Sequence, residues 1–469
     1  MKILILLLSI SSAFSAEGFK LPSDFFFGVA NAPAQVEDNL DDAWMEFAEK
    51  GRTAAFKNHS SPTEKLQFWS RPEIEIDLAA KSGVTVFRMG MDWGRVMPEE
   101  GKFDEAVLHR YQEILEMVKA RKMKVMLSLM HHSVPKWLAA KGGWTTPLGQ
   151  QQFVLFAQTL MNRFHDDVSL WITFNEGNIF AMLTYSVGIW PPGIKGSVFS
   201  PVALGPFKGA AVEAMDRMAD AHNEFFDWAH AKFPKSQIGL AHNMAFYTGK
   251  NWLNRLSARF ISNLMNWRFP DRVGSRMDFF GFNYYGAEWI KGSQIDIDPE
   301  EEYSDAGRAV YPQGLLELLK EIHERYPKLP ILITENGIGD STDILRPAYL
   351  IEHLAVVNEA IKLGIPVKGY VLWSLTDNFE WADGYCPKFG IVAVDRANGL
   401  KRVERPSFEL FSRIAQTKAV SAVERDLAWN TIQKNVDSGR PFCRHDDGVT
   451  SLNEPVLRKI VKKDWRFNP

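Results

Sequence analysis

The chain has 469 residues, of which 46% are hydrophobic, 24% charged and 12% aromatic. This composition is that of a globular protein with a large core, and it excludes an intrinsically disordered chain. With 54 Lys and Arg residues against 57 Asp and Glu residues, the net charge of −3 gives no support for a nucleic-acid-binding surface, so we expect no nucleic acid among the partners.

The first residues are typical of a secretory signal peptide. Lys2 is followed by a mostly apolar run over residues 3–14, and then by the small residues Ser15 and Ala16 that suit cleavage. The apolar run is shorter than the ~20 residues that cross a bilayer. We therefore predict a signal peptide over residues 1–16 and a secreted or periplasmic protein. The alternative is membrane association through the uncleaved segment.

Eight short runs of apolar, β-branched or aromatic residues recur along the chain and predict strands. They are residues 25–30, 84–89, 124–130, 170–174, 237–242, 278–282, 330–334 and 367–372. Segments with helical spacing of apolar residues lie between them, at 74–81, 104–121, 150–164, 209–231, 315–325 and 348–363. Because the strand runs are apolar throughout, they favour a parallel sheet covered by helices.

Eight such strand–helix units favour a single (β/α)8 TIM barrel, an α/β fold. The alternative is an open doubly wound sheet, but no phosphate-binding G-x-G-x-x-G follows the first strand. We predict the barrel over residues 17–416 and a C-terminal extension packed on it over residues 417–469. Since a minimal barrel takes about 250 residues, the excess length is expected in long loops at the C-terminal face and in the tail.

Polar side chains follow most of the predicted strands, at the end of the barrel where active sites of this fold lie. They are Gln35, Arg88, His131, Asn175, Glu176, Asn243, Asn283, Tyr285, Glu335, Asn336 and Trp373. Solvated loops are polar as well, but loops favour Gly, Ser, Lys and Asp, whereas this set holds carboxylates, a histidine, an arginine and a tryptophan. We therefore expect these side chains to share one pocket.

Two carboxylates stand out in this set, because Glu176 and Glu335 end the fourth and seventh predicted strands and a barrel would bring them across one mouth. Cleavage of a glycosidic bond requires such a pair: one group protonates the departing oxygen while the other attacks the anomeric carbon or activates water. An isolated Glu at a strand end can instead be a salt-bridge partner. The neighbouring Asn residues and tryptophans favour sugar chemistry, since indole rings pack on the apolar faces of sugars.

Metal catalysis is the competing use of Glu and His side chains. His131 and His132 are adjacent at a strand end and are expected to point to opposite faces, which does not suit one shared ion. No H-E-x-x-H or C-x-x-C sequence occurs. We therefore predict no metal and no cofactor. The two cysteines, Cys386 and Cys443, are expected to be buried thiols, with a single disulfide as the alternative.

At these residues the chain resembles the retaining β-glycosidases of glycoside hydrolase family 1. Both catalytic signatures are matched, as Thr-Phe-Asn-Glu at 173–176 and Ile-Thr-Glu-Asn-Gly at 333–337. Further matches follow in the family's order over about residues 25–412, among them the motif that runs from Trp373 to Trp381. Three departures from the family stand out: Gly177 replaces a proline, His132 stands where an aromatic residue is usual, and Cys-Pro-Lys at 386–388 replaces a common stretch that contains Arg.

The resemblance implies a role for each matched residue. Glu335 would be the nucleophile, kept ionised by Arg88 and Tyr285, and Glu176 the acid/base, which must begin protonated and therefore needs a raised pKa. Asn175 would hold the sugar 2-hydroxyl group. The remaining substrate contacts would come from Gln35, His131, Asn283, Trp373, Glu380, Trp381 and Phe389.

Three functions fit these residues. The first is a retaining exo-β-glycosidase that hydrolyses β-glucosides or β-galactosides. The second is transfer of galactosyl units between lipid-linked sugars by the same two glutamates, because variants such as His-His-Ser at 131–133 resemble the plant galactolipid galactosyltransferase branch of the family. A glycolipid substrate would bring peripheral contact with a membrane. The third is a non-catalytic sugar-binding barrel, which the loss of either Glu would have favoured. The oligomeric state leaves no mark in the sequence.

Overall fold

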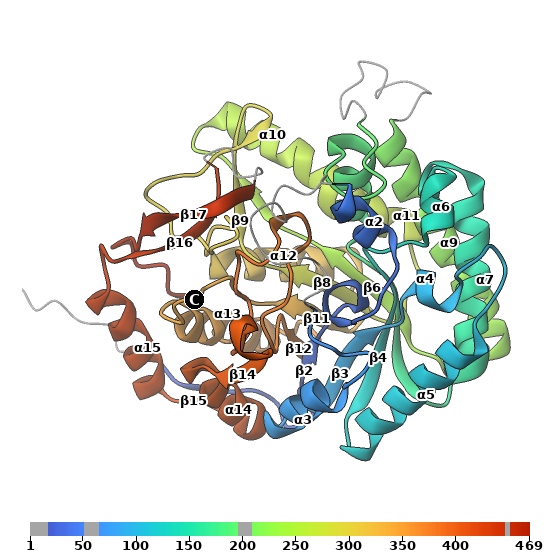
Figure 1. Cartoon of the computed structure of the whole chain (residues 1–469). Coiled ribbons are helices and arrows are strands. Elements are labelled where there is room, and N and C mark those ends of the chain that lie inside the picture. The colour runs from blue at the N-terminus through green and yellow to red at the C-terminus, as the bar shows by residue number, and fades with distance from the viewer. Residues whose placement is uncertain (1–16, 51–64, 196–208, 446–450) are drawn as a thin grey trace, which may run out of the picture.

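The apolar runs form the strands of one closed parallel barrel, ordered β11-β12-β2-β3-β4-β5-β6-β8 (Figure 1). The computed structural model describes residues 17–50, 65–195, 209–445 and 451–469. The barrel strands are β2 (Phe26–Ala30), β3 (Val86–Gly90), β4 (Lys124–His131), β5 (Val168–Asn175), β6 (Ile238–Asn243), β8 (Phe280–Tyr284), β11 (Ile331–Asn336) and β12 (Val367–Leu372). Each predicted run overlaps one of these strands, and the predicted (β/α)8 fold is confirmed.

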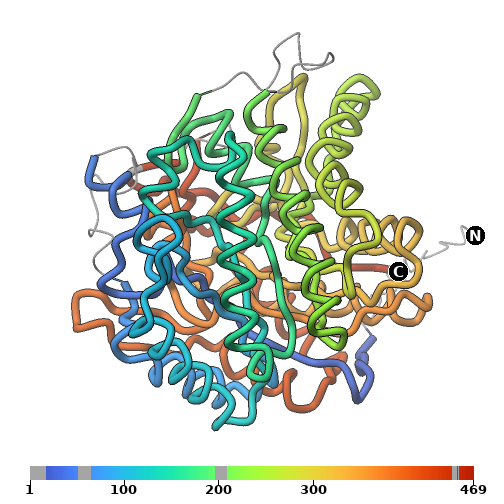
Figure 2. The backbone as a smooth tube through the Cα atoms, turned by 90° about the vertical axis from the view of Figure 1, so that its right-hand side faces the viewer, coloured from blue at the N-terminus to red at the C-terminus, as the bar shows by residue number. Residues whose placement is uncertain are grey.

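Long helices cover the outside of the barrel. They are α3 (Glu73–Lys81), α5 (Glu105–Ala120), α7 (Pro147–Phe164), α9 (Ala210–Lys232), α12 (Pro312–Arg325), α13 (Arg346–Lys362) and α14 (Pro406–Thr417). Figure 2 shows α7 and α9 side by side on this outer layer. In α5 the Asp104 side chain caps the first turn by accepting from two backbone N–H groups. Its buried residues, such as Ile114 and Val118, recur at helical spacing, and each contributes about 1.5–3 kcal/mol of burial free energy.

Shorter elements follow the strands at the C-terminal face. The helices are α1 (Pro33–Val36), α2 (Ala43–Glu49), α4 (Trp93–Val96), α6 (Lys136–Ala140), α8 (Gly177–Met182), α10 (Trp252–Ser262) and α11 (Arg268–Val273). A small sheet, ordered β10-β9-β7, continues the chain beyond β6 and β8. Its strands are β7 (Phe246–Thr248), β9 (Ala287–Lys291) and β10 (Gln294–Ile295). The sequence pattern does not predict these elements between β6 and β8.

The last part of the chain packs against the barrel through buried ion pairs. Its elements are the hairpin β13 (Val392–Asp395) with β14 (Lys401–Glu404), β15 (Ala419–Val420) paired with β1 (Phe19–Lys20), α15 (Ala422–Lys434), and the hairpin β16 (Gly439–Arg444) with β17 (Ser451–Lys459). Arg425 of α15 pairs with Glu352 of α13 at 2.6 Å. Arg440 of β16 pairs with Glu302 and Asp305, each at 2.7 Å. Loss of one partner would leave a buried charge unpaired, which is costly.

The two cysteines form a disulfide between the loop after β12 and strand β16, so the expectation of two buried thiols is wrong. Strand β16 is held against the barrel loops beside this bond, because the Cys443 N–H donates to the Asp305 carbonyl at 2.8 Å. Arg444 also donates to Asp383 at 2.6 Å. The cysteines lie 57 residues apart, and only the fold of the tail brings them together.

Removing this disulfide is expected to destabilise the protein. The double substitution Cys386→Ser, Cys443→Ser should lower the free energy of unfolding by about 2–4 kcal/mol, because the unfolded chain gains the entropy of an open loop. Urea denaturation of the variant and the oxidised wild type measures the difference, with reduced wild type as the control. Equal denaturation midpoints for all three proteins would contradict this prediction.

No helix within the described ranges is long and apolar enough to span a membrane. The predicted signal peptide over residues 1–16 lies outside the described residues.

Candidate active site

The predicted site residues meet at the C-terminal end of the barrel, where they form one connected set of contacts. Arg88 comes from β3, His131 ends β4, Asn175 ends β5, and Glu335 lies near the end of β11. Other predicted residues join this cluster from the loops: Gln35 donates to the Phe379 carbonyl, the rings of Trp373 and Trp381 lie beside His131, Trp373 donates to Glu380, and Phe389 contacts Tyr285. Asn336 is an exception among the side chains expected to share this pocket, because its amide donates to the Tyr284 carbonyl and to the Tyr349 hydroxyl.

Glu335 is buried and is held from both sides. Arg88, itself fully buried, donates from Nη1 to Glu335 Oε1 at 2.6 Å, and the Tyr285 hydroxyl donates to Oε2 at 2.5 Å. Arg88 also donates to Asn175 Oδ1 at 2.6 Å and to the Thr334 carbonyl at 2.9 Å. A fixed guanidinium with several acceptors leaves Glu335 little rotational freedom, so its carboxylate has a defined direction.

Glu176 is buried as well, and its carboxylate has its own set of contacts. The amides of Asn243 and Asn283 each donate to Glu176 Oε1 at 2.9 Å, and His132 Nε2 lies 3.5 Å from Oε2. Asn283 also donates to Asn175 Oδ1 at 3.0 Å. Asn175 thus connects the surroundings of Glu176 with those of Glu335.

The backbone of Glu176 is in the left-handed region, with φ 47° and ψ 49°, at the start of α8. Its N–H donates to the Ala241 carbonyl at 2.7 Å, and its carbonyl accepts from the Phe180 N–H at 2.9 Å. At Gly177 a β-carbon would lie 3.0 Å from the ring of Phe269. Any larger residue here therefore requires that ring to move, which accounts for glycine where the family has proline.

The pKa shifts of the two glutamates are the reverse of those that the resemblance implies. Burial raises the pKa of Glu335 to about 7, assisted by the negative charge of Glu176 and opposed by Arg88. Burial alone would raise the pKa of Glu176, but its contacts with His132, Asn243 and Asn283 leave that pKa below its usual value. The raised pKa expected for Glu176 is therefore not found in the ligand-free protein, because its hydrogen-bond donors outweigh the effect of burial. Near neutral pH Glu176 is ionised, and Glu335, with a pKa of about 7, carries a proton in part of the molecules.

The prediction that His131 and His132 point to opposite faces is wrong. Strand β4 ends at His131, and His132 has a φ of 60°, which breaks the alternation of side chains. Both imidazoles therefore lie beside Asn175 Nδ2, at 2.9 Å and 3.3 Å. Among the described residues, no group of three or more His, Cys, Asp or Glu side chains is placed to hold a metal ion.

The structure adds His132 to the predicted set, since its imidazole contacts Glu176. Strand periodicity places His132 on the other face, so no sequence pattern marked it. Asn243 was expected in the shared pocket, and its amide donates to Glu176. The ring of His132 lies against Trp190, with centroids 4.6 Å apart, and against Trp381 at 5.0 Å.

Replacing His132 by phenylalanine is expected to move the acid limb of the kcat/KM profile to higher pH. Burial lowers the pKa of His132, so the imidazole is neutral near pH 7 and acts on Glu176 as an N–H donor. Without this donor the carboxylate of Glu176 is less stabilised and its pKa rises. In the free protein Glu176 has the lower pKa of the two glutamates and therefore sets the acid limb, while Glu335, with a pKa of about 7, sets the alkaline limb. Phenylalanine keeps a ring beside Trp190 and Trp381. A profile that coincides with that of the wild type, measured with an aryl glycoside, would exclude this role for His132.

Three buried polar atoms in the cluster have no hydrogen-bond partner within the described part of the chain. They are Gln35 Oε1, His131 Nδ1 and His132 Nδ1. Trp373 donates to Glu380 Oε1 at 3.2 Å, and burial raises the pKa of Glu380 well above its usual value. Buried polar atoms are normally paired, so these groups can supply hydrogen bonds to the hydroxyl groups of a ligand.

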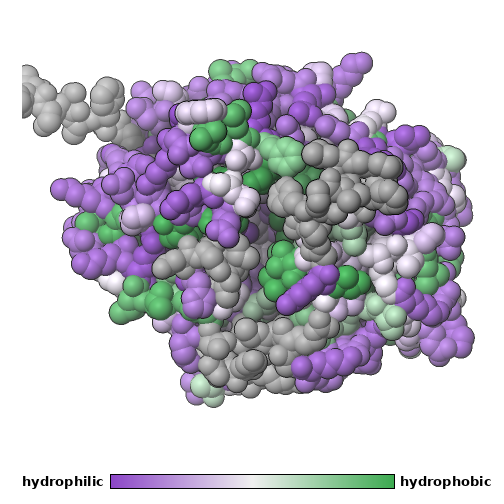
Figure 3. Space-filling model, turned by 90° about the horizontal axis from the view of Figure 1, so that it is seen from above, coloured by the Kyte–Doolittle hydropathy of each residue, from purple (hydrophilic) through white to green (hydrophobic). Residues whose placement is uncertain are grey.

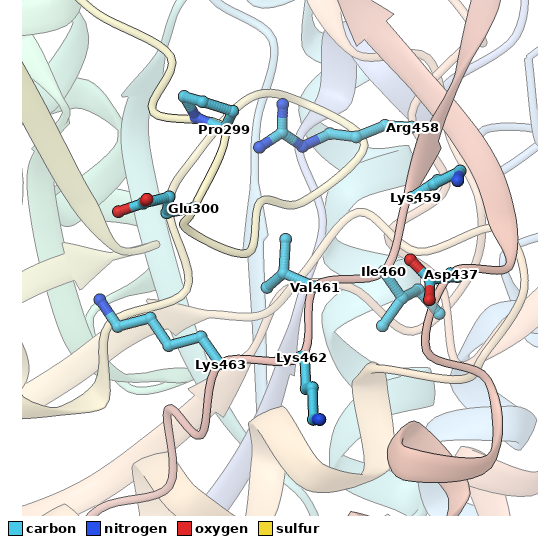
Figure 4. A pocket seen from close by; sticks show the side chains of 9 residues that line it. All are labelled: Pro299, Glu300, Asp437, Arg458, Lys459, Ile460, Val461, Lys462 and Lys463. Atoms are coloured by element: carbon cyan, nitrogen blue, oxygen red, sulfur yellow. The ribbon is translucent and has the colours of Figure 1, made fainter.

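A second concave region lies away from the glutamates. Figure 4 shows this open groove of about 600 Å³, lined by Pro299, Glu300, Asp437, Arg458, Lys459, Ile460, Val461, Lys462 and Lys463. Its basic side chains face acidic neighbours, since Lys463 pairs with Glu301. The groove contains no pair of facing carboxylates, so the chemistry described above belongs to the barrel mouth.

Comparison with known proteins agrees with this geometry. The sequence pattern of glycosyl hydrolase family 1 matches residues 18–256 and 270–420. The galactolipid galactosyltransferase SFR2 of Arabidopsis thaliana is 39% identical, over 94% of this chain and 82% of that protein. The beta-glucosidase-like SFR2 of Oryza sativa subsp. japonica is 35% identical, over 95% of this chain and 83% of that protein. A beta-glycosidase from Pyrococcus horikoshii superimposes with a TM-score of 0.78 at 27% identity, covering 87% of this chain and 98% of that one.

Proposed function

The chain belongs to glycosyl hydrolase family 1, and on that premise we propose that it cleaves β-glycosidic bonds with retention of configuration, through a covalent glycosyl–enzyme intermediate. The observation that carries this proposal is the linked pair of buried glutamates. Glu335 is aimed by Arg88 and Tyr285, and Glu176 is joined to it through Asn175 and Asn283. The unpaired polar atoms of Gln35 and His131 support a sugar ligand in the same place.

In the first step of the proposed mechanism, Glu335 attacks the anomeric carbon while Glu176 gives its proton to the departing oxygen. The bond to the aglycone breaks as the bond to Glu335 forms. Arg88 and Tyr285 stabilise the ionised nucleophile before the attack and release it as the ester forms. The proposed step requires Glu335 ionised and the proton on Glu176 when substrate is bound, which is the reverse of the pKa order in the ligand-free protein.

In the second step Glu176 acts as a base and takes a proton from the incoming hydroxyl group, whose oxygen displaces Glu335 from the anomeric carbon. Water as the acceptor gives hydrolysis, and a sugar hydroxyl gives transfer. Asn175 is proposed to bind the 2-hydroxyl group, with Gln35, His131, Asn283, Glu380 and the rings of Trp373, Trp381 and Phe389 around the rest of the sugar.

We propose a lipid-linked galactoside as the substrate and a second lipid-linked sugar as the acceptor. The similarity to a galactolipid galactosyltransferase at 39% identity supports this choice over a soluble glucoside, because the beta-glucosidases of Thermotoga and Agrobacterium are 26–27% identical. Hydrolysis of β-glucosides or β-galactosides is the second candidate, supported by those same relatives.

Incubation of the purified protein with a monogalactosyl lipid, followed by mass spectrometry, tests the proposal. Lipids that carry two or more galactose units are the expected product. Free galactose alone would establish hydrolysis and reject transfer. Turnover of aryl β-glycosides without any change in the lipid would reject the lipid substrate while leaving the double-displacement mechanism in place.

A further inference from the structure

Helix α10 carries its apolar side chains on the side that faces away from the protein. With about 100° of rotation per residue, four large apolar residues fall within a third of its circumference, opposite the buried Ala258. Their exposed fractions are 66% for Trp252, 57% for Leu253, 57% for Leu256 and 52% for Phe260. A surface helix normally turns its apolar stripe toward the core. The apolar side chains of α10 therefore face outward, whereas a helix that stabilises its own domain turns them inward.

The charges of α10 are all positive. Arg255 and Arg259 flank the apolar side, and the sequence from 249 to 270 contains no Asp or Glu. At the start of the helix, Lys250 and Lys291 line a groove of about 260 Å³ together with Asn251, Asn254, Trp289 and Asp296. Lys250 also pairs with Asp298 at 2.9 Å. An apolar face with Trp, Leu and Phe, bordered by Arg and Lys, is typical of helices that lie in a membrane interface.

α10 lies on the same end of the molecule as the glutamates. It packs on β7 and β9, which follow β6 and β8 along the chain. The ends of β6 and β8 carry Asn243 and Asn283, the two amides that donate to Glu176. Figure 3 looks onto this end and shows hydrophobic side chains beside a hollow near its centre.

We propose that α10 docks on a lipid bilayer that carries anionic headgroups, with Trp252, Leu253 and Leu256 among the acyl chains and Arg255 and Arg259 at the phosphates. The inference rests on the proposed lipid-linked substrate, whose acyl chains stay in the bilayer while its sugar enters the barrel. Docking by α10 turns the C-terminal face toward that bilayer. A symmetric dimer through α10 would instead bring the arginines of both copies together with no acidic residue on the helix to pair them.

Vesicle co-sedimentation of the full chain tests the proposal without turnover. The vesicles contain phosphatidylcholine with phosphatidylglycerol and no glycolipid. The double substitution Trp252→Ser, Leu256→Ser is expected to lower the partition coefficient about 10-fold or more, because buried apolar area drives interfacial binding. The matched control is Leu363→Ser with Val423→Ser, which removes two side chains that are 55% and 65% exposed on other elements and should leave partitioning unchanged. Arg255→Ser with Arg259→Ser should weaken binding only when phosphatidylglycerol is present.

Two further readouts separate the outcomes. Brominated lipids should quench part of the wild-type tryptophan emission, and that part should disappear in Trp252→Phe. Turnover of a soluble aryl glycoside should be the same in all variants, since none of the substituted residues contacts the glutamates. Equal partitioning of the α10 and control variants, or a change in molar mass in solution in place of a change in vesicle binding, would overturn the proposal. If docking is observed but no galactolipid product forms, the proposed substrate fails and the docking surface stands.

Discussion

Replacing Glu335 by alanine is expected to lower kcat/KM for aryl β-glycosides by roughly 10⁴-fold or more, since no other described group is aimed where this nucleophile lies. Arg88 and Tyr285 would remain without their shared acceptor. Initial rates with an aryl β-galactoside and an aryl β-glucoside measure the loss. The comparison between the two sugars also reports the preferred glycone.

The Glu335 variant needs a control for folding, because Arg88 is left as a buried charge without its closest partner and the protein should be less stable. Thermal unfolding, checked against the wild type, shows whether the variant is folded at the assay temperature. Added azide should then restore turnover of an activated aryl glycoside and yield a glycosyl azide of inverted configuration, because the small anion enters the space that the carboxylate left. A folded variant with near-normal activity would refute Glu335 as the nucleophile.

The barrel could be predicted from the sequence because each of its strands is marked by a short run of neighbouring apolar residues. Parallel strands buried on both faces are apolar throughout, so the run at 367–372 coincides with β12 (Val367–Leu372). The polar residue that ends each run lies at the one face where the chemistry of this fold is found. The place of Arg88, Asn175 and Glu335 at the ends of predicted strands therefore predicts that the three side chains lie close together.

The features that escaped prediction depend on contacts between distant segments or on a reversed pattern. The disulfide joins Cys386 to Cys443 only after the tail has folded back on the barrel. The apolar residues of α10 recur at helical spacing, which normally predicts a helix that packs on the core. In α10 these side chains face outward, so that prediction gives the wrong environment. At His132 a single positive φ reverses the direction that strand alternation predicts.

The pKa values of the two glutamates could not be predicted from the sequence either. A catalytic role assigned by resemblance implies a protonation state, but the ligand-free site sets that state through the neighbours of each carboxyl group. His132, Asn243 and Asn283 all stabilise the carboxylate of Glu176. These neighbours describe the ligand-free protein, whereas the proposed mechanism needs the proton on Glu176 in the complex with substrate. The role assigned by resemblance therefore does not predict the pKa of Glu176 in the ligand-free protein.

Replacing Glu176 by glutamine should separate substrates by leaving group. A dinitrophenyl leaving group departs without protonation, so its kcat/KM should change by about tenfold at most, whereas an alkyl β-glycoside should lose ~10²- to 10⁴-fold. Because the variant also lacks the base of the second step, the activated substrate should give a burst of dinitrophenol equal to the enzyme concentration, followed by slow turnover. Stopped-flow measurement of the burst and steady-state rates on both substrates test this prediction.

Glu380→Gln is the matched control for this experiment, since it removes another buried carboxyl group of the same cluster. Glu380 accepts from Trp373 and lies among the groups assigned to the sugar, so its loss should weaken both substrates by a similar factor. Added azide should speed the second step of the Glu176 variant and give a glycosyl azide of retained configuration, because azide attacks the intermediate without needing a base. Equal losses on the two substrates in the Glu176 variant would place its role in sugar binding and remove the case for proton transfer.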